Sequence, residues 1–265
     1  MGFTIAMAGK GGSGKTTIAA LIIRYLLRHK LTPILAVDAD PNANLHEVLG
    51  LEVESDLAAV LAEFSGSAEQ LPPGIDKSSY LQMRVQDVLV EGEDLDFLAM
   101  GSPEGAGCYC FPNAMLRQVC GRLVQNFRFV VIDNEAGLEH LSRRTTDNVD
   151  LLVVVSDSSI RGVRAAARIN RLTQQLNLKV RRRSLLVTKV QGRLPPEMRR
   201  EIKAAAMEFD GVVPYDPIVA EYDTMGRPLI ELPDTSLAVK WFNPVIAEWL
   251  NIAGQQGQEK EERDR

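Results

Sequence analysis

The chain contains little of what secretion, membrane insertion or nucleic-acid binding requires. It has three cysteines in 265 residues and a formal net charge of −5, whereas nucleic-acid phosphates attract basic surfaces. The N-terminus lacks the basic region of a signal peptide, and no apolar run is long enough to span a bilayer. We therefore expect a cytoplasmic protein with no nucleic-acid or membrane partner, whose reduced cysteines serve metal or redox chemistry.

The chain does contain a regular alternation of apolar runs and amphipathic segments. Continuous Val, Ile and Leu runs predict buried strands at 3–8, 33–37, 95–99, 129–132, 151–155 and 185–187. Apolar residues at helical spacing predict helices at 15–29, 113–125, 160–176, 196–209 and 236–253. This alternation is typical of a single α/β domain with a mostly parallel sheet flanked by helices on both faces. We assign residues 1–254 to this domain and expect the charged tail at 255–265 to be disordered.

A glycine-rich motif follows the first predicted strand and precedes the first predicted helix. Gly9, Gly14, Lys15 and Thr16 fit the spacing G-x-x-x-x-G-K-[ST], which identifies a P-loop NTPase domain. Backbone amides of such a loop surround phosphate oxygens, the lysine reaches the β- and γ-phosphates, and the threonine ligates magnesium. We expect a nucleotide and Mg²⁺ to bind at Gly11, Gly12, Ser13, Gly14, Lys15, Thr16 and Thr17.

A second lysine stands early in this loop. The stretch Gly9-Lys10-Gly11-Gly12 resembles the deviant Walker A motif of the superfamily that includes the nitrogenase iron protein and the cell-division ATPases. In that superfamily the extra lysine crosses a dimer interface and contacts the partner's nucleotide. The resemblance therefore implies a homodimer with two nucleotides between its subunits, and a catalytic role for Lys10. A solvated lysine without such a role is the alternative.

Aspartates at the ends of predicted strands supply the rest of the hydrolytic apparatus. Asp38 and Asp40 follow the second strand, where the superfamily has its switch I. Asp40 is expected to orient or deprotonate the attacking water, with Asp38 supporting magnesium from a distance. Asp133 ends a later strand and is expected to act on magnesium through water, as a Walker B carboxylate does, and Gly137 stands where switch II would sense the γ-phosphate. We predict Lys10, Lys15, Asp40 and Asp133 as catalytic residues; helix capping is the alternative for an isolated aspartate.

The residues expected near the base favour adenine. GTPases bind guanine with a carboxylate in an Asn/Thr-Lys-x-Asp stretch, and the comparable stretch 188–191 ends in Gln191 instead. The stretch 214–216 resembles the adenine-side loop of the superfamily. We therefore expect ATP, contacted by Thr188, Lys189, Pro214, Tyr215 and Asp216.

Two cysteines lie in one loop, at Cys108 and Cys110. Residues i and i+2 of an extended chain point to the same side, so both thiols can face one metal ion. A tetrahedral site needs four ligands, and the same loop of a two-fold partner would supply the other two. Two small apolar residues packed near a turn are the alternative. Cys120 lies among apolar residues at helical spacing and is expected in the core.

The P-loop, the Gly-Cys-Tyr-Cys stretch at 107–110 and the run Asp-Asn-Glu-Ala-Gly-Leu-Glu-His-Leu at 133–141 together resemble one family. They are similar to the nickel-insertion ATPases that mature carbon monoxide dehydrogenase and acetyl-CoA synthase. Stretches 213–216 and 226–229 fit as well, so the likeness runs from about residue 3 to 249. It implies that Cys108 and Cys110 bind Ni²⁺ or Zn²⁺ between two subunits, and that an ATP-dependent homodimer delivers nickel to one of these client enzymes. His140 approaches the nucleotide or the metal, or is simply exposed on a helix. Residues 55–93, the least readable part, are our expected docking surface.

Two other functions stay open. A redox ATPase would hold a [4Fe–4S] cluster between subunits, although iron proteins take their cysteines from separate loops. A partitioning or division-site ATPase would bind DNA or membrane without metal, and its membrane-binding members carry a basic amphipathic C-terminal helix. Here the tail is not basic overall, so we expect the last helix to pack on the core through an apolar stripe formed by Trp241, Phe242, Val245, Ile246 and Trp249.

Overall fold

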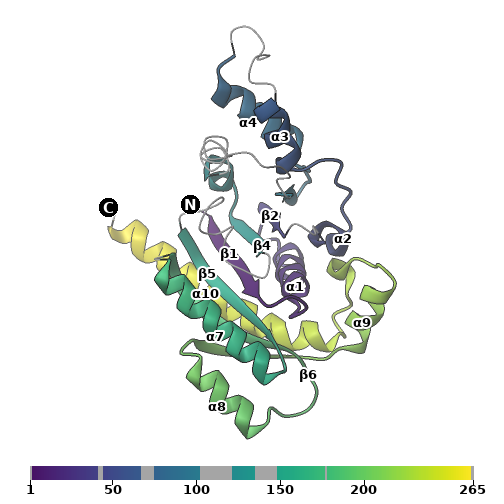
Figure 1. Cartoon of the computed structure of the whole chain (residues 1–265), viewed down its shortest axis with the longest axis vertical. Helices are drawn as coiled ribbons and strands as arrows, with labels where there is room; N and C mark the ends of the chain where they lie inside the picture. Colours follow the sequence, from purple (N-terminus) through teal and green to yellow (C-terminus); the bar gives the residue numbers. More distant parts are fainter. Residues whose placement is uncertain are drawn as a thin grey trace.

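The computed structural model describes residues 2–40, 44–66, 75–101, 121–134, 148–176 and 178–263. Within these residues, seven strands form one sheet in the order β3-β2-β4-β1-β5-β6-β7, and every neighbouring pair is parallel (Figure 1). The strands are β1 (Phe3–Gly9), β2 (Ile34–Ala39), β3 (Leu95–Ala99), β4 (Phe129–Asn134), β5 (Asn148–Asp157), β6 (Lys179–Val190) and β7 (Glu208–Pro214). The predicted parallel α/β sheet is confirmed, and its strongest apolar runs form the central strands.

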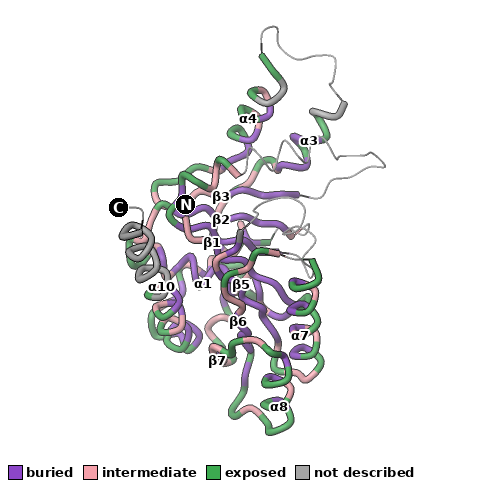
Figure 2. Tube along the Cα trace, turned by 90° about the vertical axis from the view of Figure 1, so that its left-hand side faces the viewer, coloured by how far each residue is buried: buried purple, intermediate pink, exposed green. Residues whose placement is uncertain are grey.

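Helices cover both faces of the sheet. They are α1 (Lys15–Arg28), α2 (Leu45–Leu49), α3 (Leu57–Gly66), α4 (Lys77–Asp87), α7 (Ile160–Gln175), α8 (Pro196–Ala204), α9 (Pro217–Thr224) and α10 (Leu237–Arg263), with 3₁₀ turns η1 (Val124–Asn126) and η2 (Leu229–Glu231). Ile5 and Met7 of β1 pack on the side of α1 and α10, while Ala6 and Ala8 pack on the side of α7 and α8. Because successive strand residues point to opposite faces, burial of both sets requires the continuous apolar runs seen in the sequence (Figure 2).

The last helix packs on the core through most of the predicted stripe. Phe242 and Ile246 are fully buried and Trp249 nearly so, whereas Trp241 is 59% exposed. The sequence predicted helix to residue 253 and disorder from 255, but α10 continues to Arg263. The division into a domain at 1–254 and a separate tail stays a prediction. No helix among the described residues has both the length and the apolar character needed to cross a membrane.

The C-terminal half of the sheet corrects two predictions. A single helix was expected at 196–209, but α8 ends at Ala204, Ala206 has a positive φ of 52°, and β7 begins at Glu208. The strand predicted at 185–187 extends from Lys179 to Val190, so the arginines at 181–183 lie within β6. Arg182 pairs there with Glu208 and Asp210 of β7, which explains why a charged segment forms a strand.

The segment between β2 and β3 is helical in its described parts. α3 and α4 pack against each other and extend from one end of the molecule (Figure 1). Arg84 of α4 joins the two helices by an ion pair with Glu63 of α3. This pair occupies the region that sequence patterns alone did not resolve.

Candidate nucleotide-binding site

The predicted phosphate loop lies between the end of β1 and the start of α1. α1 begins at Lys15, directly after Gly14, whose φ of 90° lies in the left-handed region that favours glycine. Gly9 is required for a different reason, because a Cβ at this position would lie 2.3 Å from the carbonyl oxygen of Val155 on β5. The loop therefore turns tightly into a helix N-terminus, which is the geometry that presents backbone amides to phosphate.

Thr16 and Asp133 meet at the carboxyl ends of the central strands. Thr16 Oγ1 donates a 2.6 Å hydrogen bond to Asp133 Oδ2, and Asp133 is 1% exposed. Burial raises the pKa of Asp133 to about 7, with a smaller contribution from the nearby charge of Asp38. Lys15, also buried, acts in the opposite direction. This carboxylate is therefore held where a cation would restore its charged form.

Buried polar atoms at this point fit a magnesium nucleotide. Within the described part of the chain, Asp133 Oδ1 and Ser13 Oγ are buried and have no hydrogen-bond partner. Buried polar groups are nearly always paired, so the unpaired oxygen of Asp133, whose other oxygen bonds Thr16, and the unpaired hydroxyl of Ser13 in the loop fit a bound ligand. Carboxylate and hydroxyl oxygens are donors that Mg²⁺ accepts. Thr16 and Asp133 would hold this ion, and the loop would hold the phosphates.

Asp38 shapes the segment that leads to Asp40. Its Oδ1 accepts a hydrogen bond from the Asp40 amide at 3.1 Å, and its Oδ2 accepts one from the Leu45 amide at 2.8 Å. Burial is the main cause that raises the pKa of Asp38 to about 6. Asp38 is the register partner of Asp133, so the two carboxylates lie on adjacent strands. Asp38 thus positions Asp40 beside the candidate magnesium site, and Asp40 itself is partly exposed.

The predicted base-side residues contact the phosphate loop directly. Thr188 Oγ1 donates to Ser13 O at 2.7 Å, and Lys189 Nζ donates to Gly12 O at 3.0 Å. Lys189 has a positive φ of 56°, which aims its side chain back to the loop at a conformational cost. These two residues, which were predicted to contact the base, therefore brace the phosphate loop. Their contact with a base stays a prediction.

The stretch 214–216 lies at the end of β7, and Asp216 has a structural role there. Its Oδ1 accepts from the Ile218 amide and caps α9, while its Oδ2 accepts from Ser236 Oγ and from the Ala238 amide at the start of α10. These bonds hold the pKa of Asp216 below its usual range, although burial acts against them. Asp216 fixes the loop that carries Pro214 and the exposed Tyr215.

Asn134 is a site residue for which sequence reasoning assigned no role. It follows Asp133, is buried, and donates from Nδ2 to Met7 O at 2.8 Å, which joins the ends of β4 and β1. Its Oδ1 is buried without a described partner. The only sequence feature that could have pointed to Asn134 is its position directly after Asp133.

Several predicted residues cannot be placed with the others. Lys10 is exposed in the loop, as a residue that acts on a partner subunit would be. Cys108, Cys110, Cys120, Gly137 and His140 lie outside the described residues. Among the residues that are described, no group of three His, Cys, Asp or Glu side chains could hold a metal ion. The proposed cysteine site is thus neither placed nor tested by the geometry.

Comparison with known proteins agrees with this site. The family described as the CobQ/CobB/MinD/ParA nucleotide binding domain matches residues 4–229. An uncharacterized ATP-binding protein of Methanocaldococcus jannaschii is 41% identical over 249 residues, covering 93% of this chain and 98% of that protein. The carbon monoxide dehydrogenase accessory protein CooC of Rhodospirillum rubrum is 32% identical over 243 residues, covering 86% of this chain and 89% of that protein.

Solved structures show the same fold at lower identity. The septum site-determining protein MinD of Pyrococcus horikoshii, solved with Mg-ADP, superposes with a TM-score of 0.69 and 22% identity, covering 96% of this chain and 98% of that one. A ParA family ATPase from Chlorobium tepidum superposes with a TM-score of 0.67 and 18% identity, covering 94% and 98%. At these identities the likeness shows the fold alone.

Proposed function

The chain belongs to the CobQ/CobB/MinD/ParA family of nucleotide-binding domains, and on that premise we propose that it is a magnesium-dependent ATPase. The observation that carries this proposal is the Thr16–Asp133 pair, with one buried Asp133 oxygen lacking a partner beside the phosphate loop. Magnesium bound there would offset the negative charge of the phosphates during transfer. The side chains of the site position the phosphates and the attacking water, since phosphoryl transfer needs positioning more than covalent chemistry.

Each residue of the site has a distinct task in this proposal. Lys15, at the N-terminus of α1, neutralises the β- and γ-phosphates. Asp40, held by the Asp38 carboxylate through its own amide, orients the attacking water. Thr188 and Lys189 hold the loop carbonyls of Ser13 and Gly12 and so keep the loop amides turned inward. ATP is preferred because the stretch 188–191 lacks the carboxylate that guanine would need.

We further propose that nucleotide binding assembles a homodimer through Lys10. Lys10 is exposed in the loop, so it is free of the protein interior and positioned to approach a nucleotide on a second subunit. Charge-assisted hydrogen bonds contribute about 1.5–3 kcal/mol each. Two such lysines, one from each subunit, would supply a large part of the about 5.5 kcal/mol that converts a mostly open population to a mostly closed one.

The proposed cargo of this dimer is nickel for carbon monoxide dehydrogenase or acetyl-CoA synthase. Two findings support it, namely the 32% identity to a carbon monoxide dehydrogenase accessory protein and the Cys108-x-Cys110 stretch of this sequence. Two thiolates from each subunit make a four-ligand site for Ni²⁺ or Zn²⁺. Hydrolysis would loosen the interface and release the ion to the client.

Activation of a nickel-free client enzyme tests this function. Wild-type protein with ATP should activate nickel-depleted carbon monoxide dehydrogenase at nickel concentrations that fail alone, and Cys108→Ala should not. Cys120→Ala is the matched control, because it removes a thiol that was predicted to lie in the core. Equal activation by Cys108→Ala and wild type would contradict the nickel-delivery role but not the proposed ATPase activity.

A partitioning ATPase is the second candidate, and exposed apolar side chains at the start of α10 favour it. Trp241 and Leu237 are exposed on the first turns of α10, where an apolar contact with a membrane or protein surface is available. ATP-dependent co-sedimentation with liposomes or DNA, at a level unaffected by Cys108→Ala, would support this candidate instead.

A further inference from the structure

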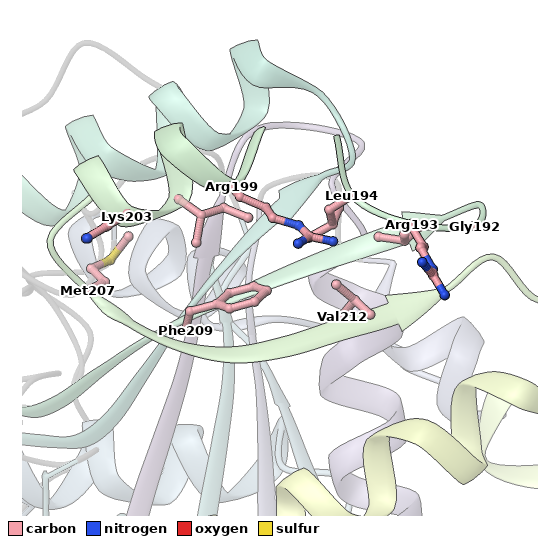
Figure 3. A pocket seen from close by; sticks show the side chains of 10 residues that line it. Gly192, Arg193, Leu194, Arg199, Lys203, Met207, Phe209 and Val212 are labelled. Atoms are coloured by element: carbon pink, nitrogen blue, oxygen red, sulfur yellow. The ribbon is translucent and has the colours of Figure 1, made fainter. Parts of the chain in front are cut away.

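A surface groove lies between α8 and β7, on the face of the sheet opposite to α1. It has a volume of about 660 Å³ and begins at Val190, just beyond the residues that brace the phosphate loop (Figure 3). β7 is the last strand of the described sheet, so the groove is open on its outer side. None of the residues assigned to the nucleotide site lines it.

The floor of the groove is apolar. It is formed by Leu194, Ile202, Met207, Phe209 and Val212. Phe209 of β7 is 40% exposed, whereas Val213 of the same strand is buried in the core. A solvent-exposed aromatic ring in a groove is typical of a surface that a partner covers.

Three cations surround this floor. Figure 3 shows Arg199 extending over the groove near Phe209, with Lys203 toward one end and Arg193 toward the other. Arg199 and Lys203 are four residues apart on α8 and so lie on one side of that helix. Within the described residues, none of these three cations makes an ion pair or a side-chain hydrogen bond. Neighbouring arginines do have acidic partners: Arg164 pairs with Glu201, Arg182 with Glu208 and Asp210, and Arg200 with Glu197.

We propose that this groove binds an acidic, amphipathic peptide segment of a protein partner. Acidic side chains of the segment pair with Arg193, Arg199 and Lys203, and its apolar side chains cover Phe209 and Val212. This arrangement provides both steering by charge and burial of apolar area. This cluster of three cations is notable because the whole chain has a net charge of −5. The proposal goes beyond the nucleotide and nickel chemistry and does not depend on either.

A peptide fits this groove better than the other ligands that cations attract. Small ligands bury most of their surface in enclosed pockets, whereas Phe209 on this floor is open to solvent. Nucleic-acid phosphates need a basic stripe but gain nothing from an apolar floor. The three cations lie at separate places along the groove, so they suit several acidic groups spaced along one chain.

The test uses the full-length chain and an array of labelled peptides in which the number and spacing of Glu and Leu residues vary. We expect peptides that contain both residue types to bind, and Arg199→Glu/Lys203→Glu to weaken the best of them about tenfold or more. Arg168→Glu/Arg171→Glu on α7 is the matched control, since these arginines are exposed and outside the groove. Phe209→Ala should also weaken binding, while ATP turnover stays unchanged in all three variants.

Four outcomes would overturn the proposal. They are no binding anywhere in the array, equal loss in the α7 control, equal affinity for peptides that contain Glu without Leu, and displacement of the peptide by duplex DNA at lower concentration. Because ATP turnover is measured on the same variants, failure of the peptide proposal is separate from failure of the proposed function.

Discussion

Thr16 Oγ1 and Asp133 Oδ2 lie 2.6 Å apart although 117 residues separate them in the chain. Thr16 is in the first turn of α1, and Asp133 is at the end of β4, which pairs in parallel with β1. The parallel register places Met7 beside Asp133, so the strand that leads into the phosphate loop also aligns the carboxylate. This contact joins the phosphate loop directly to the carboxylate that we propose holds magnesium.

Loss of either partner should remove magnesium dependence. Thr16→Ala and Asp133→Asn should each lower ATP turnover by roughly 100-fold or more, since both remove support for charge developing on the phosphates. Nucleotide affinity should then become the same with Mg²⁺ and with EDTA. Isothermal titration under both conditions measures this. Thr224→Ala, which removes a hydroxyl at the end of α9, is the control; a magnesium response that persists in Asp133→Asn would contradict the assignment.

The buried carboxylates of Asp133 and Asp38 should make the stability of the nucleotide-free protein depend on pH. Burial raises the pKa of Asp133 from 3.8 to about 7 and that of Asp38 from 3.8 to about 6. The folded chain therefore binds protons more tightly than the unfolded chain. The protonated carboxyls contribute fully to the free energy of unfolding below about pH 4, and this contribution is lost as the pH rises through 6 and 7. In EDTA, the melting temperature should fall from pH 5 to pH 8. Asp133→Asn should show a smaller fall, and an equal slope in both proteins would show that Asp133 is not the source of the pH dependence.

Mixing of two inactive variants tests whether Lys10 acts across subunits. Lys10→Ala and Lys15→Ala homodimers should both be inactive. A mixed dimer has one site with an intact Lys15 and an intact Lys10 from the partner, so an equal mixture should recover about a quarter of wild-type turnover. If Lys10 acts within its own subunit, no mixture recovers activity. Lys240→Ala, at an exposed position on α10, should behave as wild type alone.

Asp216 should contribute more to stability than to nucleotide affinity. Its carboxylate caps α9 and holds Ser236 and Ala238 at the start of α10. Asp216→Ala should lower the free energy of unfolding by about 1–3 kcal/mol in urea titrations. Asp223→Ala, an exposed carboxylate on the same helix, should change it little. A large loss of ATP affinity in Asp216→Ala well below its melting temperature would instead support a direct contact with the base.

The central sheet and the loop between β1 and α1 were predictable because their signals are local. The P-loop is one contiguous stretch, and β1, β2, β4 and β5 are continuous apolar runs buried on both faces. β7 was missed because its residues take their strand conformation from pairing with β6. Glu208 and Asp210 are charged, and Arg182 on the neighbouring strand pairs with both of them, while Ser184 and Trp249 also donate hydrogen bonds to Asp210. The hydrogen bonds that Asp216 accepts from Ser236 and Ala238 at the start of α10 likewise join residues that are twenty or more positions apart in the chain.

Metal content and solution mass, measured together, show whether the ATP-bound dimer carries nickel. Protein purified without oxygen is supplied with Ni²⁺, with or without a non-hydrolysable ATP analogue, and analysed by light scattering and elemental analysis. We expect a dimer with the analogue that holds about one nickel ion, and loss of that ion in Cys108→Ala while the ATPase activity remains. A dimer that hydrolyses ATP but holds no nickel, or equal nickel in Cys108→Ala, would contradict the nickel-delivery role.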